Sequence, residues 1–126
     1  NNLQNRLILI GNVADVALYL RQASILVSFS KYEGLGMSIL EARSMGVPCV
    51  SFAVKTGPLE IIHDGIDGYL VQPFDCDTMI GKINTLIENP SLRKQFAKQA
   101  LLSMGDFETE TIIKQWKDIL ERLTCT

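Results

Sequence analysis

Two glutamates around a pair of glycines are the residues of this chain best suited to chemistry. Residues 33–41 read Glu-Gly-Leu-Gly-Met-Ser-Ile-Leu-Glu, so Glu33 and Glu41 stand eight positions apart, with Gly34 and Gly36 after the first of them. Glycine lets the backbone approach a ligand closely, and a carboxylate accepts hydrogen bonds from hydroxyl groups. Where such a segment opens a helix, the free N–H groups and the helix dipole favour an anion such as a diphosphate. The segment therefore predicts a site for a phosphorylated ligand that is rich in hydroxyl groups.

Different residues of the predicted helix would bind different parts of such a ligand. The amides of residues 35–38 would face the phosphates, and Glu41 lies just over one turn inside the helix. An ionised carboxylate in a largely apolar helix needs a partner or solvent, and two neighbouring ribose hydroxyls would serve as that partner. Glu33 then faces whatever lies beyond the phosphates, which in an activated sugar is the hexose. The other interpretation is that Gly34 and Gly36 only shape a turn and that both glutamates face water, since the third glycine of the dinucleotide fingerprint is absent.

Short apolar runs alternate with amphipathic stretches along the chain. The runs predict buried strands at residues 7–10, 24–29, 49–54 and 69–71. The stretches between them predict helices at residues 16–20, 37–44 and 59–63. Asp15 is expected to cap the first of these helices, and Gly46 and Pro48 are expected to end the second. This order builds a parallel sheet with helices on both faces, so the predicted fold class is α/β and Rossmann-like.

The ends of the predicted strands and the remainder of the chain complete this plan. Ligands of parallel sheets bind at the carboxyl ends of the strands, which here are followed by loops at residues 11–12, 31–36, 55–60 and 72–73. Apolar residues then repeat at helical spacing in three stretches, at residues 79–87, 92–101 and 112–123. We expect these stripes to pack on the core, and the last, which includes Trp116, could also serve a neighbouring domain.

Composition limits the classes of protein to which the chain can belong. It has 126 residues, of which 47% are hydrophobic and 21% charged, with a net charge of −2. We expect one domain over residues 1–126, with a core at 7–88 and a helical C-terminal part at 89–126. The mild acidity argues against a nucleic-acid partner, and no apolar run approaches the roughly 20 residues of a membrane-spanning helix. Because no Met opens the chain, we expect it to be a piece of a longer protein.

Metal chemistry and nucleophilic catalysis find little support in the sequence. Cys49, Cys76 and Cys125 are far apart and form no C-x-x-C pair, which is typical of reduced thiols in a cytosolic protein and excludes a cysteine zinc site. His63 is the only histidine, so neither a catalytic triad nor a metal site is expected there. Asp67, like the other aspartates at residues 64, 75 and 77, is interpreted as a turn or helix-cap residue.

A series of short motifs accompanies the two glutamates in a fixed order. The series comprises Ala23-Ser24, Ser30, the E-x7-E segment from Glu33 to Glu41, Gly46-Val47-Pro48, Gly57-Pro58-x-Glu60-Ile61-Ile62 and Asp64-Gly65-x-x-Gly68-Tyr69-Leu70-Val71. Over residues 7–88 it resembles the C-terminal, donor-binding domain of retaining glycosyltransferases with the GT-B architecture, glycosyltransferase family 4, also called glycosyl transferases group 1. The fold implied is the second domain of a GT-B protein, with part of its sheet missing.

The resemblance implies a role for each residue of the segment. Glu33 contacts the transferred sugar and is the catalytic candidate; the amides of Gly34, Leu35, Gly36 and Met37 line the phosphates; Glu41 holds the ribose. Residues 11–13 would lie near the base. The donor implied is a UDP-, GDP- or ADP-sugar, with no metal and no further cofactor. The reaction implied is hexosyl transfer, with retention, to a hydroxyl group of a glycan, a lipid-linked sugar or a polysaccharide precursor.

Two departures from the family pattern bear on this transfer. Family members place an Arg and a Lys upstream, near the first strands of this domain, and the chain does not contain that region; Lys31 and Lys55 do not match those positions. The N-terminal, acceptor-binding domain of the same protein is also outside the chain, so the fragment alone is expected to be inactive. The resemblance further implies a cytoplasmic enzyme, with peripheral association at the inner face of the membrane as a further option.

Two other functions stay open at this point. One is a non-catalytic α/β module that binds a nucleotide or another protein. A phosphoacceptor receiver domain is disfavoured within that class, because Gly11-Asn12 and Ser30-Lys31 stand where acidic residues would be needed. The other is a sugar-nucleotide epimerase of related architecture. Titration with UDP, GDP and ADP would separate these alternatives.

Overall fold

Three parallel strands form the centre of the molecule. The computed structural model describes residue 3 and residues 6–124. Strands β1 (Leu26–Ser28), β2 (Cys49–Phe52) and β3 (Gly68–Val71) lie in the order β1-β2-β3. Val27 pairs with Val50 across the first ladder, and Ser51 pairs with Leu70 across the second. The parallel α/β sheet predicted from the sequence is confirmed.

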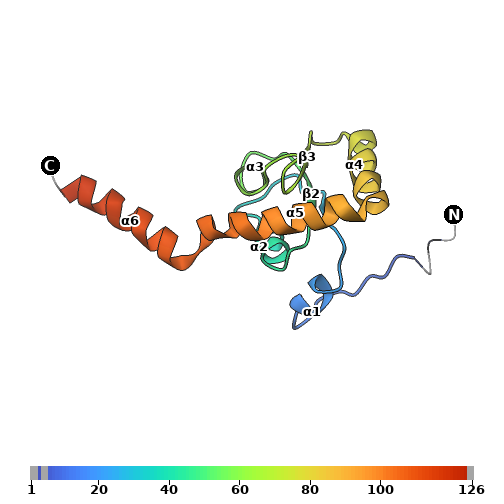
Figure 1. Ribbon diagram of the computed structural model, residues 1–126, viewed down its shortest axis with the longest axis horizontal. Coiled ribbons are helices and arrows are strands. Elements are labelled where there is room, and N and C mark those ends of the chain that lie inside the picture. Colours follow the sequence, from blue (N-terminus) through green and yellow to red (C-terminus); the bar gives the residue numbers. More distant parts are fainter. Residues whose placement is uncertain (1–2, 4–5, 125–126) are drawn as a thin grey trace.

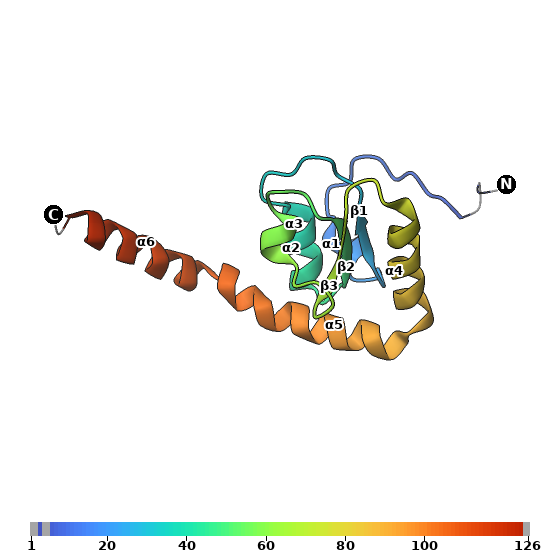
Figure 2. The same ribbon diagram turned by 90° about the horizontal axis from the view of Figure 1, so that it is seen from above.

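Helices cover both faces of this sheet. Helices α1 (Ala17–Leu20), α2 (Met37–Ser44), α3 (Pro58–Ile61), α4 (Cys76–Glu88) and α5 (Pro90–Ser103) are followed by a 3-10 turn η1 (Met104–Phe107) and by α6 (Thr109–Thr124). Figure 2 shows α2 and α3 on one face, α4 on the other, and α5 along the end where the strands begin. The carboxyl ends of the strands therefore lie at the opposite end of the sheet from α5.

Two apolar clusters fill the space between the sheet and its helices. One lies beneath α2 and α3 and contains Leu20, Ile39, Ala42, Val47, Cys49, Ile61 and Ile62. The other lies beneath α4 and α5 and contains Val50, Phe52, Val54, Val71, Met79, Leu86 and Phe96. All residues of β2 are buried, because this central strand has helices on both sides. The apolar run that predicted this strand is therefore explained by burial on both faces.

Helix α2, which carries Glu41, has the bounds that the sequence predicts. It begins at Met37, directly after Gly36, and ends at Ser44. At its end the N–H of Gly46 donates to the carbonyl of Arg43 at 2.9 Å, and Pro48 follows two residues later. The short helix before β1 begins at Ala17, one residue later than predicted, and its N-cap residue is Val16 rather than Asp15. A carboxylate oxygen of Asp15 nevertheless accepts the N–H of Ala17 at 2.9 Å.

The strand predicted at residues 7–10 is wrong. This segment has no ladder partner in the described part of the chain, and the side chains of Ile8 and Leu9 are 79% and 88% exposed. Figure 1 shows the N-terminal segment extending away from α1 and from the sheet toward the N-terminus. A strand needs a neighbour for its N–H and C=O groups. An apolar run alone does not provide one.

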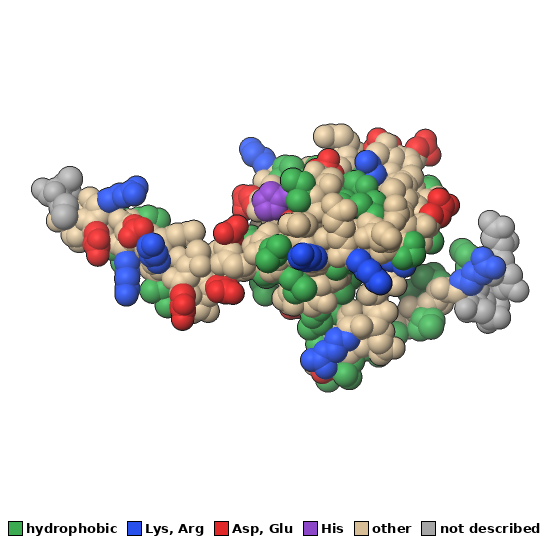
Figure 3. All heavy atoms as spheres, viewed as in Figure 1, with side chains coloured by type: hydrophobic (Ala, Val, Ile, Leu, Met, Phe, Trp, Pro, Cys, Tyr) green, Lys and Arg blue, Asp and Glu red, His purple; other side chains and the backbone are tan. Residues whose placement is uncertain are grey.

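The last apolar stripe does not pack on the core as predicted, and its docking on a neighbouring domain stays a prediction. Helix α6 has no buried residue, and its apolar residues Ile112, Trp116, Ile119, Leu120 and Leu123 are all exposed. Figures 1 and 2 show α6 projecting away from the sheet, and Figure 3 shows hydrophobic side chains on its surface beside charged ones. Helical spacing identifies an apolar face but does not say what covers it.

The other two stripes are only partly buried. Met79, Leu86, Phe96 and Ala100 enter the core as predicted, whereas Ile80, Ile87 and Leu101 are exposed. No helix among residues 6–124 combines the length and hydropathy needed to cross a lipid bilayer.

Candidate functional site

The loops that follow β1 and β2 are in close backbone contact at the carboxyl ends of these strands. Gly57, in the loop after β2, has a φ of +79°, and a Cβ atom there would lie 2.9 Å from the carbonyl oxygen of Leu35 and 3.2 Å from the nitrogen of Gly36. Only glycine allows this approach. The hydroxyl of Thr56 also donates to the carbonyl of Glu33. The segment from Glu33 to Gly36 is therefore held in place by the neighbouring loop.

The N-terminus of α2 has no side-chain cap, in contrast to those of α4 and α5. Gly36 precedes it with a φ of +77° and a ψ of +48°, no side chain bonds to its first turn, and that turn contains no acidic residue. By comparison, Asp75 caps α4 with a hydrogen bond of 3.0 Å and Asn89 caps α5 with one of 3.0 Å. The first N–H groups of a helix have no partner within it. At α2 they are available to an anionic ligand.

Glu33 lines a hollow at the strand ends. The hollow has a volume of about 270 Å³ and is formed by Lys31, Tyr32, Glu33, Ala53, Val54, Lys55, Thr56 and Pro73. Glu33 itself is half-buried. These residues belong to the loops after β1, β2 and β3, so the three strand ends combine to form the hollow, as expected for a parallel sheet.

Glu41 lines a different hollow, on the side of α2 that faces α1. Its volume is about 330 Å³, and it is formed by Ala14, Asp15, Val16, Ala17, Leu20, Glu41 and Met45. Ala14 directly follows residues 11–13, which the resemblance places near a base. The two carboxylates thus line separate hollows, and the uncapped first turn of α2 lies between them in the chain.

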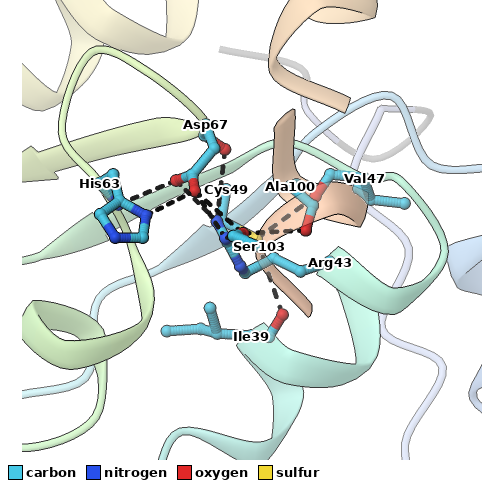
Figure 4. A network of polar contacts seen from close by, with 8 residues as sticks. All are labelled: Ile39, Arg43, Val47, Cys49, His63, Asp67, Ala100 and Ser103. Carbon is cyan, nitrogen blue, oxygen red and sulfur yellow. Dashed lines mark hydrogen bonds and ion pairs between the residues drawn. The ribbon is translucent and has the colours of Figure 1, made fainter. Parts of the chain in front are cut away.

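A buried ionic network lies at the other end of α2, and the sequence analysis missed it. Arg43 is fully buried, and its Nη1 and Nη2 donate to the two carboxylate oxygens of Asp67 at 2.8 and 2.7 Å. Ser103 accepts a further bond from Nη2, and the backbone N–H and Nδ1 of His63 lie 2.8 and 2.9 Å from the same carboxylate. Figure 4 shows these side chains converging from α2, the loop before β3, and α5.

Asp67 is therefore more than the turn residue that its sequence context predicts. Burial alone would raise the pKa of its carboxyl group, but the hydrogen bonds from Arg43 and His63 outweigh burial and lower that pKa from 3.8 to about 2. The sequence did contain one signal of this pair. Arg43 follows Ala42 and lies one turn after Ile39, on the buried face of α2, where a charged side chain requires a partner.

No metal site is visible among residues 3 and 6–124, where no group of three His, Cys, Asp or Glu side chains could hold an ion. Cys49 and Cys76 are free thiols. Burial raises the pKa of the Cys49 thiol to about 12, so it is neither a ligand nor a nucleophile at neutral pH. Cys125 lies outside the described residues.

Comparison with known proteins identifies the family of the chain. The sequence model of the family described as "Glycosyl transferases group 1" matches residues 1–102. The chain belongs to this family. The resemblance stated for residues 7–88 is confirmed, and the match extends into α5.

Individual relatives agree with this assignment. The amylovoran biosynthesis glycosyltransferase AmsD of Erwinia amylovora is 39% identical over 105 residues, which cover 83% of this chain and 29% of AmsD. A crystal structure of S. aureus TarM whose ligands include UDP matches with a TM-score of 0.87 and 32% identity, over 93% of this chain and 24% of that one. Anabaena HepE in complex with UDP matches with a TM-score of 0.85 and 27% identity, over 95% and 33% of the two chains. The chain thus spans a quarter to a third of the relatives it matches.

Proposed function

We propose that the whole protein transfers a hexosyl group, with retention, from a nucleoside-diphosphate sugar to a hydroxyl acceptor, and that this chain binds the donor. The observation that carries the proposal is the uncapped, glycine-initiated N-terminus of α2, with one carboxylate before it and one inside it, at the carboxyl ends of a parallel sheet. The UDP in the TarM and HepE structures supports a nucleotide ligand, and UDP in particular, for a chain of the same family.

Each part of the donor has a matching group in the chain. The first-turn N–H groups of α2 bind the diphosphate and stabilise the negative charge that it gains as it leaves. Glu41 accepts hydrogen bonds from the ribose in the hollow beside α1, and Glu33 accepts them from the hexose in the hollow at the strand ends. No nucleophile is named, because neither carboxylate is fixed behind the reacting carbon.

The remaining parts of the reaction belong outside this chain. We expect the acceptor, a glycan or polysaccharide precursor, to be held by an N-terminal domain of the same protein. The upstream Arg and Lys of the family pattern would assist the leaving diphosphate. The reaction would take place in the cytoplasm or at the inner face of the membrane, without a metal ion and without nucleic acid.

Calorimetric titration of the full-length protein with UDP, GDP and ADP tests the donor site. We expect one nucleotide to bind, and the Glu41→Gln variant to weaken its binding about tenfold, since a hydrogen bond to a charged group contributes about 1.5–3 kcal/mol. Glu88→Gln, an exposed glutamate at the end of α4, is the matched control and should leave the affinity unchanged. If none of the three nucleotides binds, the proposal is wrong.

A further inference from the structure

The rim of the Glu33 hollow carries cations and aromatic rings for which the transfer reaction has so far assigned no role. We define the rim as Lys31, Tyr32, Lys55 and Phe74. Lys31, Tyr32 and Lys55 line the hollow directly, and Pro73, next to Phe74, lines it as well. The rings of Tyr32 and Phe74 are 82% and 67% exposed. Aromatic rings with this exposure at a site entrance gain more from a ligand than from the core.

The two lysines have no carboxylate partner. In the described part of the chain the ion pairs join Asp67 to Arg43 and to His63, so neither lysine forms one. The ammonium group of Lys31 lies 5.5 Å from the ring centre of Tyr32 and 5.9 Å from that of Phe74, within cation–π range. Together with Glu33, these side chains give the hollow an excess of one positive charge, in a chain whose net charge is −2.

Phe74 adopts a backbone conformation that is unfavourable for a residue with a Cβ atom. Its φ is +70°, and it is the one residue other than glycine with a positive φ in the described part of the chain. This conformation directs the chain from β3 into α4 while the ring stays near Lys31 and 6.0 Å from the ring of Phe52. Strained residues gather at ligand sites, where the strain fixes a functional group in place.

We propose that the rim binds a saccharide that carries a carboxylate or phosphate group. The sugar ring lies on the faces of Phe74 and Tyr32, because the C–H face of a pyranose is apolar and complements the negative face of an aromatic ring. Its anionic group lies between Lys31 and Lys55, while Glu33 accepts hydrogen bonds from its hydroxyl groups. The inference rests on the proposed function, since it concerns the hollow assigned there to the hexose.

The anionic group can come from the donor or from the acceptor, and two arms of one experiment distinguish them. In the donor arm, the full-length protein is assayed with UDP-glucose and UDP-glucuronate, which differ only at C6. In the acceptor arm, binding of maltohexaose and of its 6-carboxylated form is measured in the presence of UDP. We expect the charged member of one pair to be favoured at least tenfold, and that arm names the source.

Two variants of equal charge change assign this preference to the rim. Lys31→Gln/Lys55→Gln should reduce the preference for the charged ligand to less than twofold. Lys94→Gln/Lys98→Gln, on the exposed side of α5, should retain the full preference. Phe74→Gly removes the ring and the unfavourable φ together, so the melting temperature should be maintained while charged and neutral sugars both bind about tenfold more weakly.

The outcomes separate this inference from the proposed function. If the wild-type protein transfers sugar but favours the charged ligand in neither arm, or if the preference persists in Lys31→Gln/Lys55→Gln, the anionic subsite is wrong and the transferase stands. If none of UDP, GDP and ADP binds and no nucleotide sugar is hydrolysed or transferred, both are wrong.

Discussion

The charged side chains on helix α2 and in the loop before it lie in two different environments. At the C-terminal end, Arg43 is fully buried and both of its terminal nitrogens bond to the carboxylate of Asp67. By contrast, Glu33 in the loop before the helix and Glu41 on its exposed side line open hollows, and neither forms an ion pair with a described residue. Helix α2 and the loop before it thus carry a buried ion pair, in which only the Nε of Arg43 is without a hydrogen bond, close to two carboxylates that form no ion pair with a described residue.

This difference separates the groups that hold the fold from those available to a ligand. A buried charge without a partner costs several kcal/mol, so Arg43 is committed to Asp67. The pair connects α2 with the loop before β3, and Ser103 connects both with α5, so the network fixes the helix that presents Glu41. The carboxylates of Glu33 and Glu41 are in contact with solvent and need no such partner, so they can accept hydrogen bonds from a ligand.

The comparison predicts its largest effect at Asp67. Asp67→Ala leaves the guanidinium of Arg43 buried without its partner, so the free energy of unfolding should fall by about 3–5 kcal/mol. Urea denaturation of the full-length protein measures this loss. The double variant Arg43→Met/Asp67→Leu removes both charges and should recover most of it. A loss below about 1 kcal/mol in Asp67→Ala would show that the pair does not hold the helix.

Glu33 should show the reverse pattern, with a loss of rate and none of stability. Glu33→Gln should lower kcat about 100-fold, or about 3 kcal/mol in the transition state, because it removes a charged contact to the transferred sugar. Its free energy of unfolding should change by less than about 0.5 kcal/mol, as for other half-exposed side chains without a partner. Steady-state kinetics beside Glu41→Gln, which should mainly raise the donor KM, provide the check. Near-normal constants for both variants would contradict the assignment.

The sequence predicted this half of the comparison better than the other. The bounds of α2 were right because local signals agree with the packing: Gly36 opens the helix, and Gly46 and Pro48 close it. The loops at residues 31–36, 55–60 and 72–73 follow strands as predicted, because parallel strands end at one edge, whereas residues 11–12 follow no strand among the described residues. That Glu33 and Glu41 line two hollows rather than one could not be read from their spacing, because it depends on where α1 packs.

The wrong predictions share one physical cause: a local residue pattern does not specify which other part of the protein it contacts. The run at residues 7–10 has the composition of a buried strand, but the described chain provides no neighbour for it. The stripe around Trp116 has the spacing of a packed helix, but none of the residues of α6 is buried. Asp67 precedes a glycine and resembles a turn residue, while its partner Arg43 lies 24 positions away.

Acid should weaken the buried ion pair between Arg43 and Asp67, and this loss distinguishes the pair from the exposed carboxylates. The pKa of Asp67 is about 2 in the folded protein against an ordinary 3.8. Above about pH 5 the carboxylate is ionised in both states, and its pairing contributes fully. As the pH falls from about 4 to 2, the unfolded chain binds the proton first, so about 2 kcal/mol of stability is lost. Urea denaturation across this range should show the loss in the wild type, and Asp67→Asn should lack this part of it.

The smallest effect is expected at His63, the solvent-facing member of the network. Its side chain is 55% exposed, whereas that of Asp67 is 1% exposed. His63→Ala removes the Nδ1 contact, but the backbone N–H of residue 63 still donates to Asp67, and Arg43 keeps both of its bonds. The free energy of unfolding at pH 7 should therefore fall by less than about 1 kcal/mol. If urea denaturation gave a loss as large as that of Asp67→Ala, the position of the Asp67 carboxylate would depend on the imidazole, and the stabilising network around Arg43 would extend to the surface.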